Sequence, residues 1–116
     1  MDDVNPEKVN EYIEMMQLTG KVAFAEGKFS KTDFSTGQRK RLALIVSLLE
    51  ERPILVLDEW AADQDPPFRK FFYETLLPKL KQEGKTIIAI THDDKYFHIA
   101  DRMYKMEYGK LTEQTI

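Results

Sequence analysis

The sequence of 116 residues contains no cysteine, which excludes disulfide bonds and thiolate metal sites. No apolar run approaches the roughly 20 residues that a membrane-spanning helix needs. The amino terminus begins with the acidic Met1-Asp2-Asp3, and we see no secretory or transit segment there. The net charge of −3 argues against nucleic-acid binding through a broadly basic surface. We therefore expect a soluble domain that faces the cytosol.

Glycine is scarce as well. The five glycines lie at positions 20, 27, 37, 84 and 109, and none belongs to a G-x-x-x-x-G-K-[ST] phosphate loop. The backbone amides of such a loop cradle the phosphates of a bound nucleotide. The chain therefore lacks the element with which P-loop nucleotide hydrolases hold their substrate.

The amino-terminal third predicts two helices. Asn5 and Pro6 are a typical cap and first helical position, and apolar residues at helical spacing predict an amphipathic helix that ends near Gly20. Residues 21–33 predict a short extended or irregular connection. The second helix is expected over residues 35–51, and its apolar second half predicts burial on most sides.

A strand, a helix and a second strand follow. Residues 54–57 form a continuous apolar run, which is typical of a central parallel strand covered on both faces. The next helix begins after Asp65 and carries an apolar stripe, and Pro78 should kink it or end its regular part. Residues 85–91 predict the second strand, with its isoleucines buried. This order indicates an α/β crossover unit, and a hairpin around Tyr108-Gly109 closes the chain.

Three ionisable side chains follow the two predicted strands. Asp58 and Glu59 end the first strand, and His92 follows the second. The carboxyl ends of parallel strands lie at one sheet edge, where α/β proteins bind ligands. One carboxylate could hold hydrated Mg²⁺ through water, the other could orient an attacking water, and the histidine could bind a phosphate. The alternative is that the acidic pair only ends a strand and the histidine is structural.

The start of the second helix predicts a phosphate site. Ser35, Thr36, Gly37 and Gln38 place small polar residues where a helix exposes unpaired amides and a partial positive charge. The alternative is an ordinary capped helix, followed by a solvated basic face at residues 39–41.

The order and spacing of these features favour a function. Gln38 precedes Glu59 by 21 residues, and Glu59 precedes His92 by 33. In this order the chain resembles the carboxyl-terminal half of an ABC-type ATP-binding cassette. The matching motifs are the signature (residues 35–39), Walker B (residues 54–58), the catalytic glutamate (Glu59), the D-loop (residues 61–66) and the switch-histidine loop (residues 91–93).

The resemblance implies a fold and a division of the chain. It implies part of a P-loop-NTPase (RecA-like) parallel sheet with flanking helices. Residues 1–34 would be part of the helical subdomain and its connection. Residues 35–116 would be the carboxyl-terminal part of the ATPase core.

The resemblance also assigns roles. In the family, two cassettes enclose two ATP molecules. Catalysis would fall to Glu59 and His92, and Asp58 would support Mg²⁺ through water. The residues expected at the ATP of the opposing subunit are Ser35, Thr36, Gly37 and Gln38, and those expected to cross the dimer interface are Asp63 and Gln64.

The wording of the motifs is most similar to the bacterial cyclic-peptide exporter group, in which a membrane domain and a cassette share one chain. Thr36 and Trp60 depart from the commoner superfamily wording. The expected function is ATP hydrolysis that powers peptide export at the cytoplasmic face of the inner membrane. The alternatives are a soluble ABC-type ATPase of chromosome maintenance or translation, and a non-catalytic interaction module.

Several family elements have no counterpart in the sequence: Walker A, the adenine-stacking aromatic residue and the glutamine loop. We therefore expect the chain to be the carboxyl-terminal piece of a longer protein whose membrane domain lies upstream. Alone it should neither bind ATP tightly nor hydrolyse it. Apolar surface that the missing half would cover should make it self-associate.

Overall fold

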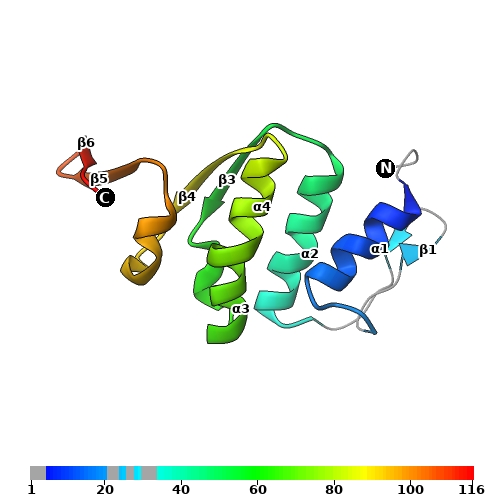
Figure 1. Cartoon of the computed structure of the whole chain (residues 1–116). Helices are drawn as coiled ribbons and strands as arrows, with labels where there is room; N and C mark the ends of the chain where they lie inside the picture. The colour runs from blue at the N-terminus through cyan, green and yellow to red at the C-terminus, as the bar shows by residue number, and fades with distance from the viewer. Residues whose placement is uncertain (1–4, 21–23, 26–27, 30–33) are drawn as a thin grey trace. The chain divides into compact units, whose positions relative to one another are not determined.

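The computed structural model describes residues 5–20, 24–25, 28–29 and 34–116. The chain divides into two compact units, Met1–Leu55 and Val56–Ile116. Figure 1 labels most of their helices and strands along the chain. Most of the predicted irregular connection at residues 21–33 lies outside the described residues. Within it, the short strands β1 (Phe24–Ala25) and β2 (Lys28–Phe29) pair antiparallel. Among the residues that the structure describes, no helix is both long and apolar enough to cross a membrane.

Helix α1 (Pro6–Met15) begins as predicted, because the Asn5 side chain accepts a hydrogen bond from the Glu7 amide at 2.9 Å. It ends earlier than the predicted Gly20. Gln17 adopts a left-handed backbone with a φ of 59°, and the Leu18 amide donates to the Ile13 carbonyl at 2.9 Å. This Schellman arrangement satisfies the last carbonyls and terminates the helix without a glycine.

Helix α2 (Thr36–Leu49) packs against α1 within the first unit. Its bounds agree with the prediction to within two residues. Burial on most sides was wrong for this chain, because Leu44, Ile45 and Leu48 are buried whereas Leu42 and Val46 are only partly covered. The first unit therefore covers one face of this helix.

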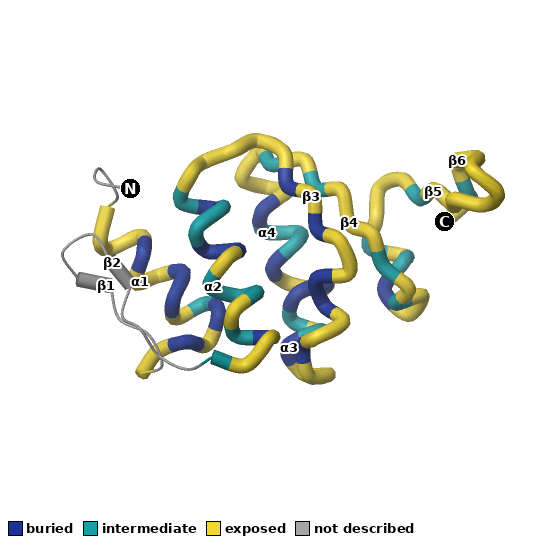
Figure 2. The backbone as a smooth tube through the Cα atoms, turned by 180° about the vertical axis from the view of Figure 1, so that it is seen from behind, coloured by how far each residue is buried: buried dark blue, intermediate teal, exposed yellow. Residues whose placement is uncertain are grey.

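The strands β3 (Ile54–Asp58) and β4 (Thr86–Ile90) are neighbours in a small parallel sheet. The prediction that both faces of the sheet are covered was wrong. Alternate β3 residues are buried, but Val56 is 62% exposed, and Ile88 and Ile90 are each 50% exposed (Figure 2). In the second unit α4 packs against β4, and a two-stranded sheet with helical cover on one face leaves the other face open.

The helical segment between these strands has three parts: α3 (Pro66–Phe71), a π-helical turn (Phe72–Leu76) and α4 (Leu77–Gln82). Pro78 lacks an amide hydrogen and cannot bond to the carbonyl four residues earlier. The predicted disruption by this proline is confirmed, and it takes the form of the π turn. The buried hydrophobic residues of the segment are Phe68, Phe72, Tyr73, Leu76 and Leu80, whereas Phe71 is only partly buried.

The carboxyl-terminal part consists of a 3₁₀ helix (Asp94–Ile99) and the hairpin of β5 (Met103–Glu107) and β6 (Lys110–Gln114). Tyr108 and Gly109 form the two-residue turn, with φ of 50° and 75°. Positive φ at both central residues is the geometry of a type I′ hairpin turn. The predicted hairpin is therefore confirmed.

Candidate functional site

Glu59 and His92 meet at the carboxyl edge of the β3–β4 sheet. Glu59 Oε1 lies 3.0 Å from His92 Nε2, and the two side chains are 46% and 92% exposed. The Glu59 amide donates to the Ile90 carbonyl at 2.7 Å, which fixes the end of one strand to the end of the other. A carboxylate and an imidazole are thus held together where solvent or a ligand can reach both.

The backbone of Glu59 is unusual. Its φ of 49° and ψ of 37° place it in the left-handed region, which costs an ordinary residue about 1–2 kcal/mol. Such residues are held in place by their surroundings, and here the hydrogen bond to Ile90 contributes. Asp58, the last residue of β3, lies on the exposed face of the strand with Val56. Its carboxylate oxygens are of the type that Mg²⁺ prefers.

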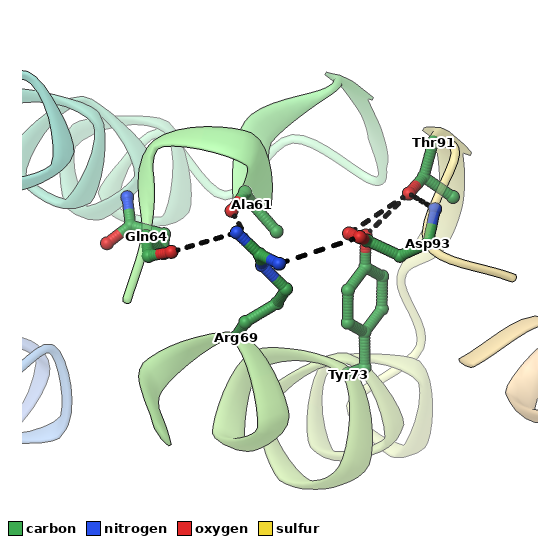
Figure 3. Close-up of polar contacts among 6 residues, drawn as sticks. All are labelled: Ala61, Gln64, Arg69, Tyr73, Thr91 and Asp93. Atoms are coloured by element: carbon green, nitrogen blue, oxygen red, sulfur yellow. Dashed lines mark hydrogen bonds and ion pairs between the residues drawn. The ribbon is translucent and has the colours of Figure 1, made fainter. Parts of the chain in front are cut away.

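A short 3₁₀ helix, Trp60–Asp63, follows Glu59 directly. The Trp60 ring stacks on Phe72 with ring centres 4.5 Å apart, which anchors this segment to the helical layer. Asp63 is exposed, whereas Gln64 is buried within the chain itself. Arg69 on α3 donates from Nε to the Ala61 carbonyl at 3.2 Å and from Nη2 to the Gln64 carbonyl at 3.1 Å (Figure 3).

A ring of hydrogen bonds holds the loop that carries His92. The Tyr73 hydroxyl lies 2.8 Å from Asp93 Oδ2 and 2.7 Å from Thr91 Oγ1, and the Asp93 amide donates to Thr91 Oγ1 at 2.9 Å (Figure 3). An ionised Asp93 carboxylate has no proton to give, so Tyr73 donates to it and Thr91 donates to Tyr73. Each of the three residues is both donor and acceptor in a closed ring.

The electrostatics of Tyr73 agree with this assignment. The pKa of Tyr73 is raised from 10.0 to about 12, chiefly by burial; the hydrogen bond from Thr91 opposes this rise, and the hydrogen bond to Asp93 and its negative charge add to it. Within the described residues, no buried side-chain oxygen or nitrogen lacks a hydrogen-bond partner. The neutral phenol is therefore the form that the fold stabilises.

The start of α2 belongs to the first unit, whereas Glu59 and His92 belong to the second. The Gln38 amide donates to Ser35 Oγ at 3.2 Å, and the Ser35 amide donates to Gln38 Oε1 at 3.0 Å. This capping box occupies acceptor atoms of both side chains, so it does not use the Ser35 hydroxyl hydrogen or the Gln38 side-chain amide hydrogens. Gly37 is buried while Ser35 and Thr36 are exposed. The donors of this helix start suit an anion.

A family model described as "ABC transporter" matches residues 3–62, which is more than half of the chain. The chain belongs to the ABC transporter family. It is 57% identical over 99 residues to ATP-binding protein SyrD of Pseudomonas syringae pv. syringae, covering 84% of this chain and 18% of that protein. The predicted family is therefore confirmed.

Other ABC relatives are less similar. An energy-coupling factor transporter ATP-binding protein of Streptococcus pneumoniae serotype 2 (strain D39 / NCTC 7466) is 41% identical over 95 residues, covering 79% of this chain and 34% of the relative. The glutathione/L-cysteine transport system ATP-binding/permease protein CydD of Bacillus subtilis (strain 168) is 42% identical over 77 residues, covering 66% and 13%. The chain thus spans about a third or less of the length of these three curated relatives.

The structure places the residues predicted as the Walker B end, the D-loop and the switch-histidine loop in the second unit, and those predicted as the signature in the first. Sequence reasoning missed Arg69 and Tyr73, which hold residues 61–64 and 91–93, the segments predicted as the D-loop and the switch-histidine loop. A signal was present, because the two residues are four positions apart on the helical segment that follows residue 65. Their partners lie on two separate loops, and the sequence does not show that these loops adjoin.

Proposed function

We propose that the chain supplies the carboxyl-terminal part of the ATP-hydrolysing cassette of an ABC exporter that moves a peptide, of cyclic type, across the inner membrane. The observation that carries the catalytic part is the 3.0 Å contact between Glu59 and His92 at the sheet edge. The wording of the motifs and the 57% identity to SyrD support the exporter assignment. In this proposal residues 1–34 belong to the helical subdomain and residues 35–116 to a RecA-like core.

Glu59 and His92 would act on the γ-phosphate of ATP. The carboxylate of Glu59 accepts hydrogen bonds, so it can orient and polarise an attacking water. Because His92 Nε2 faces a carboxylate, its tautomer carries the proton on Nε2, and this N–H can turn to a phosphate oxygen. When bound, Mg²⁺ neutralises charge on the phosphate oxygens. Asp58 would support it through water.

The signature residues would serve a second cassette in a homodimer. The start of α2 at Ser35, Thr36, Gly37 and Gln38 presents donors to the ATP that the opposing subunit holds. The helix dipole adds about 0.3–1 kcal/mol at an exposed site, and up to about 2 kcal/mol at a partly buried one. Asp63 and Gln64 in the D-loop would approach the partner. The transmembrane domain of the same protein would lie upstream and place the cassette at the cytoplasmic face.

The test is Glu59→Gln in the full-length transporter that contains this chain. Loss of the carboxylate should lower ATP hydrolysis by about 10²- to 10⁴-fold and leave ATP binding intact. Glu74→Gln, at an exposed position on the helical layer, is the matched control and should keep the wild-type rate. Near wild-type hydrolysis by Glu59→Gln would refute the assignment of the base.

The 116-residue chain should not bind Mg-ATP by itself. It has no phosphate loop, and the donors at the start of α2 would complete a site only with a partner's nucleotide. Isothermal titration calorimetry should therefore show no binding in the micromolar range. A micromolar dissociation constant would show that the residues present suffice for a nucleotide site.

A further inference from the structure

Arg69 lies between two functional loops. Its Nε and Nη2 donate to the D-loop carbonyls of Ala61 and Gln64, at 3.2 and 3.1 Å. Its Nη1 lies 3.8 Å from Asp93 Oδ1, in the residue that directly follows the switch histidine. One guanidinium therefore contacts both loops at once (Figure 3).

We propose that Arg69 and Tyr73 are positioning residues that join the D-loop to the switch-histidine loop, so that a displacement of the D-loop by a partner cassette is transmitted to His92. The inference rests on the proposed function and names the connection by which one nucleotide site would sense the other.

The chemistry of Arg69 suits this role. A guanidinium is planar and presents its N–H groups in fixed directions, so two groups bind carbonyls while a third faces a carboxylate. The Arg69 and Asp93 side chains are both largely covered by protein, which limits solvent screening of their attraction. A lysine would keep the charge, but its single ammonium could not reproduce the fork.

Tyr73 contacts the second carboxylate oxygen of Asp93, the one that Arg69 does not face. It binds Asp93 Oδ2 while Arg69 faces Oδ1, so both carboxylate oxygens are contacted by one helical segment. The Tyr73 ring also stacks on Tyr96, with centres 4.5 Å apart, which holds the residues beyond the loop. The positions on either side of His92 are thus fixed by the ring of Thr91, Asp93 and Tyr73.

His92 depends on this support. Its side chain is 92% exposed and its one described polar contact is with Glu59, so little packing holds the imidazole directly. The backbone of the loop, set by Thr91 and Asp93, therefore determines where the imidazole lies. A shift of the D-loop carbonyls would move Arg69, then Asp93, and with it the residue beside it.

The first experiment reads the connection without nucleotide. In the 116-residue chain, Arg69→Lys should change the NMR chemical shift of the His92 ring and leave that of His98, the other histidine of the chain, unchanged. Lys70→Gln, at the neighbouring exposed position, is the control and should move neither ring. Equal His92 shifts in wild type and Arg69→Lys would overturn the proposal.

The second experiment uses the full-length transporter. Arg69→Lys and Tyr73→Phe should each lower kcat for ATP by about 10- to 100-fold, as expected when a catalytic group is misplaced by a fraction of an ångström to about 1 Å, with KM little changed. Because both act through Asp93, the double variant should lose less than the product of the single losses. Unchanged kcat, or a loss that only follows the amount of folded protein, would overturn the proposal.

The two experiments separate this inference from the proposed function. A moved His92 resonance together with a wild-type transporter that hydrolyses no ATP would support the connection and refute the ATPase. An active wild type with unaffected Arg69→Lys would refute the connection alone.

Discussion

The two faces of the β3–β4 sheet differ in what covers them. On one face Leu55 and Leu57 are buried. On the other, Val56, Ile88 and Ile90 are at least half exposed although they are equally apolar (Figure 2). Neighbouring residues of one strand therefore lie in a core and at a surface.

This difference teaches how the apolar run of β3 should be interpreted. An uninterrupted apolar strand is typical of a sheet that is covered on both faces. The described residues supply helical cover for one face only. We therefore expect the open face to be covered in the assembled protein, by residues outside this chain or by a second copy.

The largest expected effect separates the two faces directly. Leu57→Ala should lower the free energy of unfolding by about 2–5 kcal/mol, because it leaves a cavity in a packed core. Val56→Ala, one residue earlier on the exposed face, should cost at most about 1 kcal/mol. Urea unfolding followed by the fluorescence of Trp60, the one tryptophan, measures both. Equal losses would mean that the outer face is covered in the chain as it stands.

An effect of intermediate size on the free energy of unfolding is expected from Tyr73, and it should depend on pH. Because the folded state raises the pKa of Tyr73 from 10.0 to about 12, the unfolded chain ionises first. The stabilisation is complete below about pH 10 and is lost as the pH rises to about 12, which amounts to about 3 kcal/mol. Urea unfolding across this range should show a flatter pH dependence for Tyr73→Phe than for wild type.

The matched control for this titration is Tyr108→Phe, since Tyr108 is fully exposed at the tip of the hairpin. This variant should keep the wild-type dependence on pH. A wild-type slope in Tyr73→Phe would assign the alkaline loss of stability to other groups.

The smallest effect on stability is expected from a substitution on the open sheet face, which should instead change self-association. Ile90→Lys places a charge on the open sheet face and should weaken the expected self-association while changing stability little. Thr75→Lys adds the same charge at an exposed helical position and should leave association unchanged. Light scattering over a range of concentrations measures this. A wild type that remains monomeric at high concentration would contradict the expectation.

Local chemistry accounts for what the sequence predicted well. The Asn5 cap, the Tyr108-Gly109 turn and the disruption at Pro78 each depend on a few adjacent residues. The pairing of Glu59 with His92 followed from a general rule about sheet edges, which needs only the order of the strands.

The remainder depends on contacts between distant segments. Local sequence propensity does not predict the left-handed backbone of Glu59. That conformation is held in part by a hydrogen bond to Ile90, which is distant in the sequence. Arg69 and Tyr73 gain their partners only when two loops adjoin. Ile88 and Ile90 are half exposed although their strand is as apolar as a covered one, and composition does not distinguish the two cases.

The π turn at Phe72–Leu76 has a geometric consequence for comparing relatives. A π turn inserts one residue into an α-helix, which rotates everything after it by about 100°. Phe68 and Leu80 are 12 positions apart and would lie about 120° apart on a regular helix, but with the inserted residue discounted they fall within about 20°. The inserted residue thus keeps both ends of the apolar row on the side of the helix that faces the core. Relatives that lack it should align through this helix only with a one-residue gap.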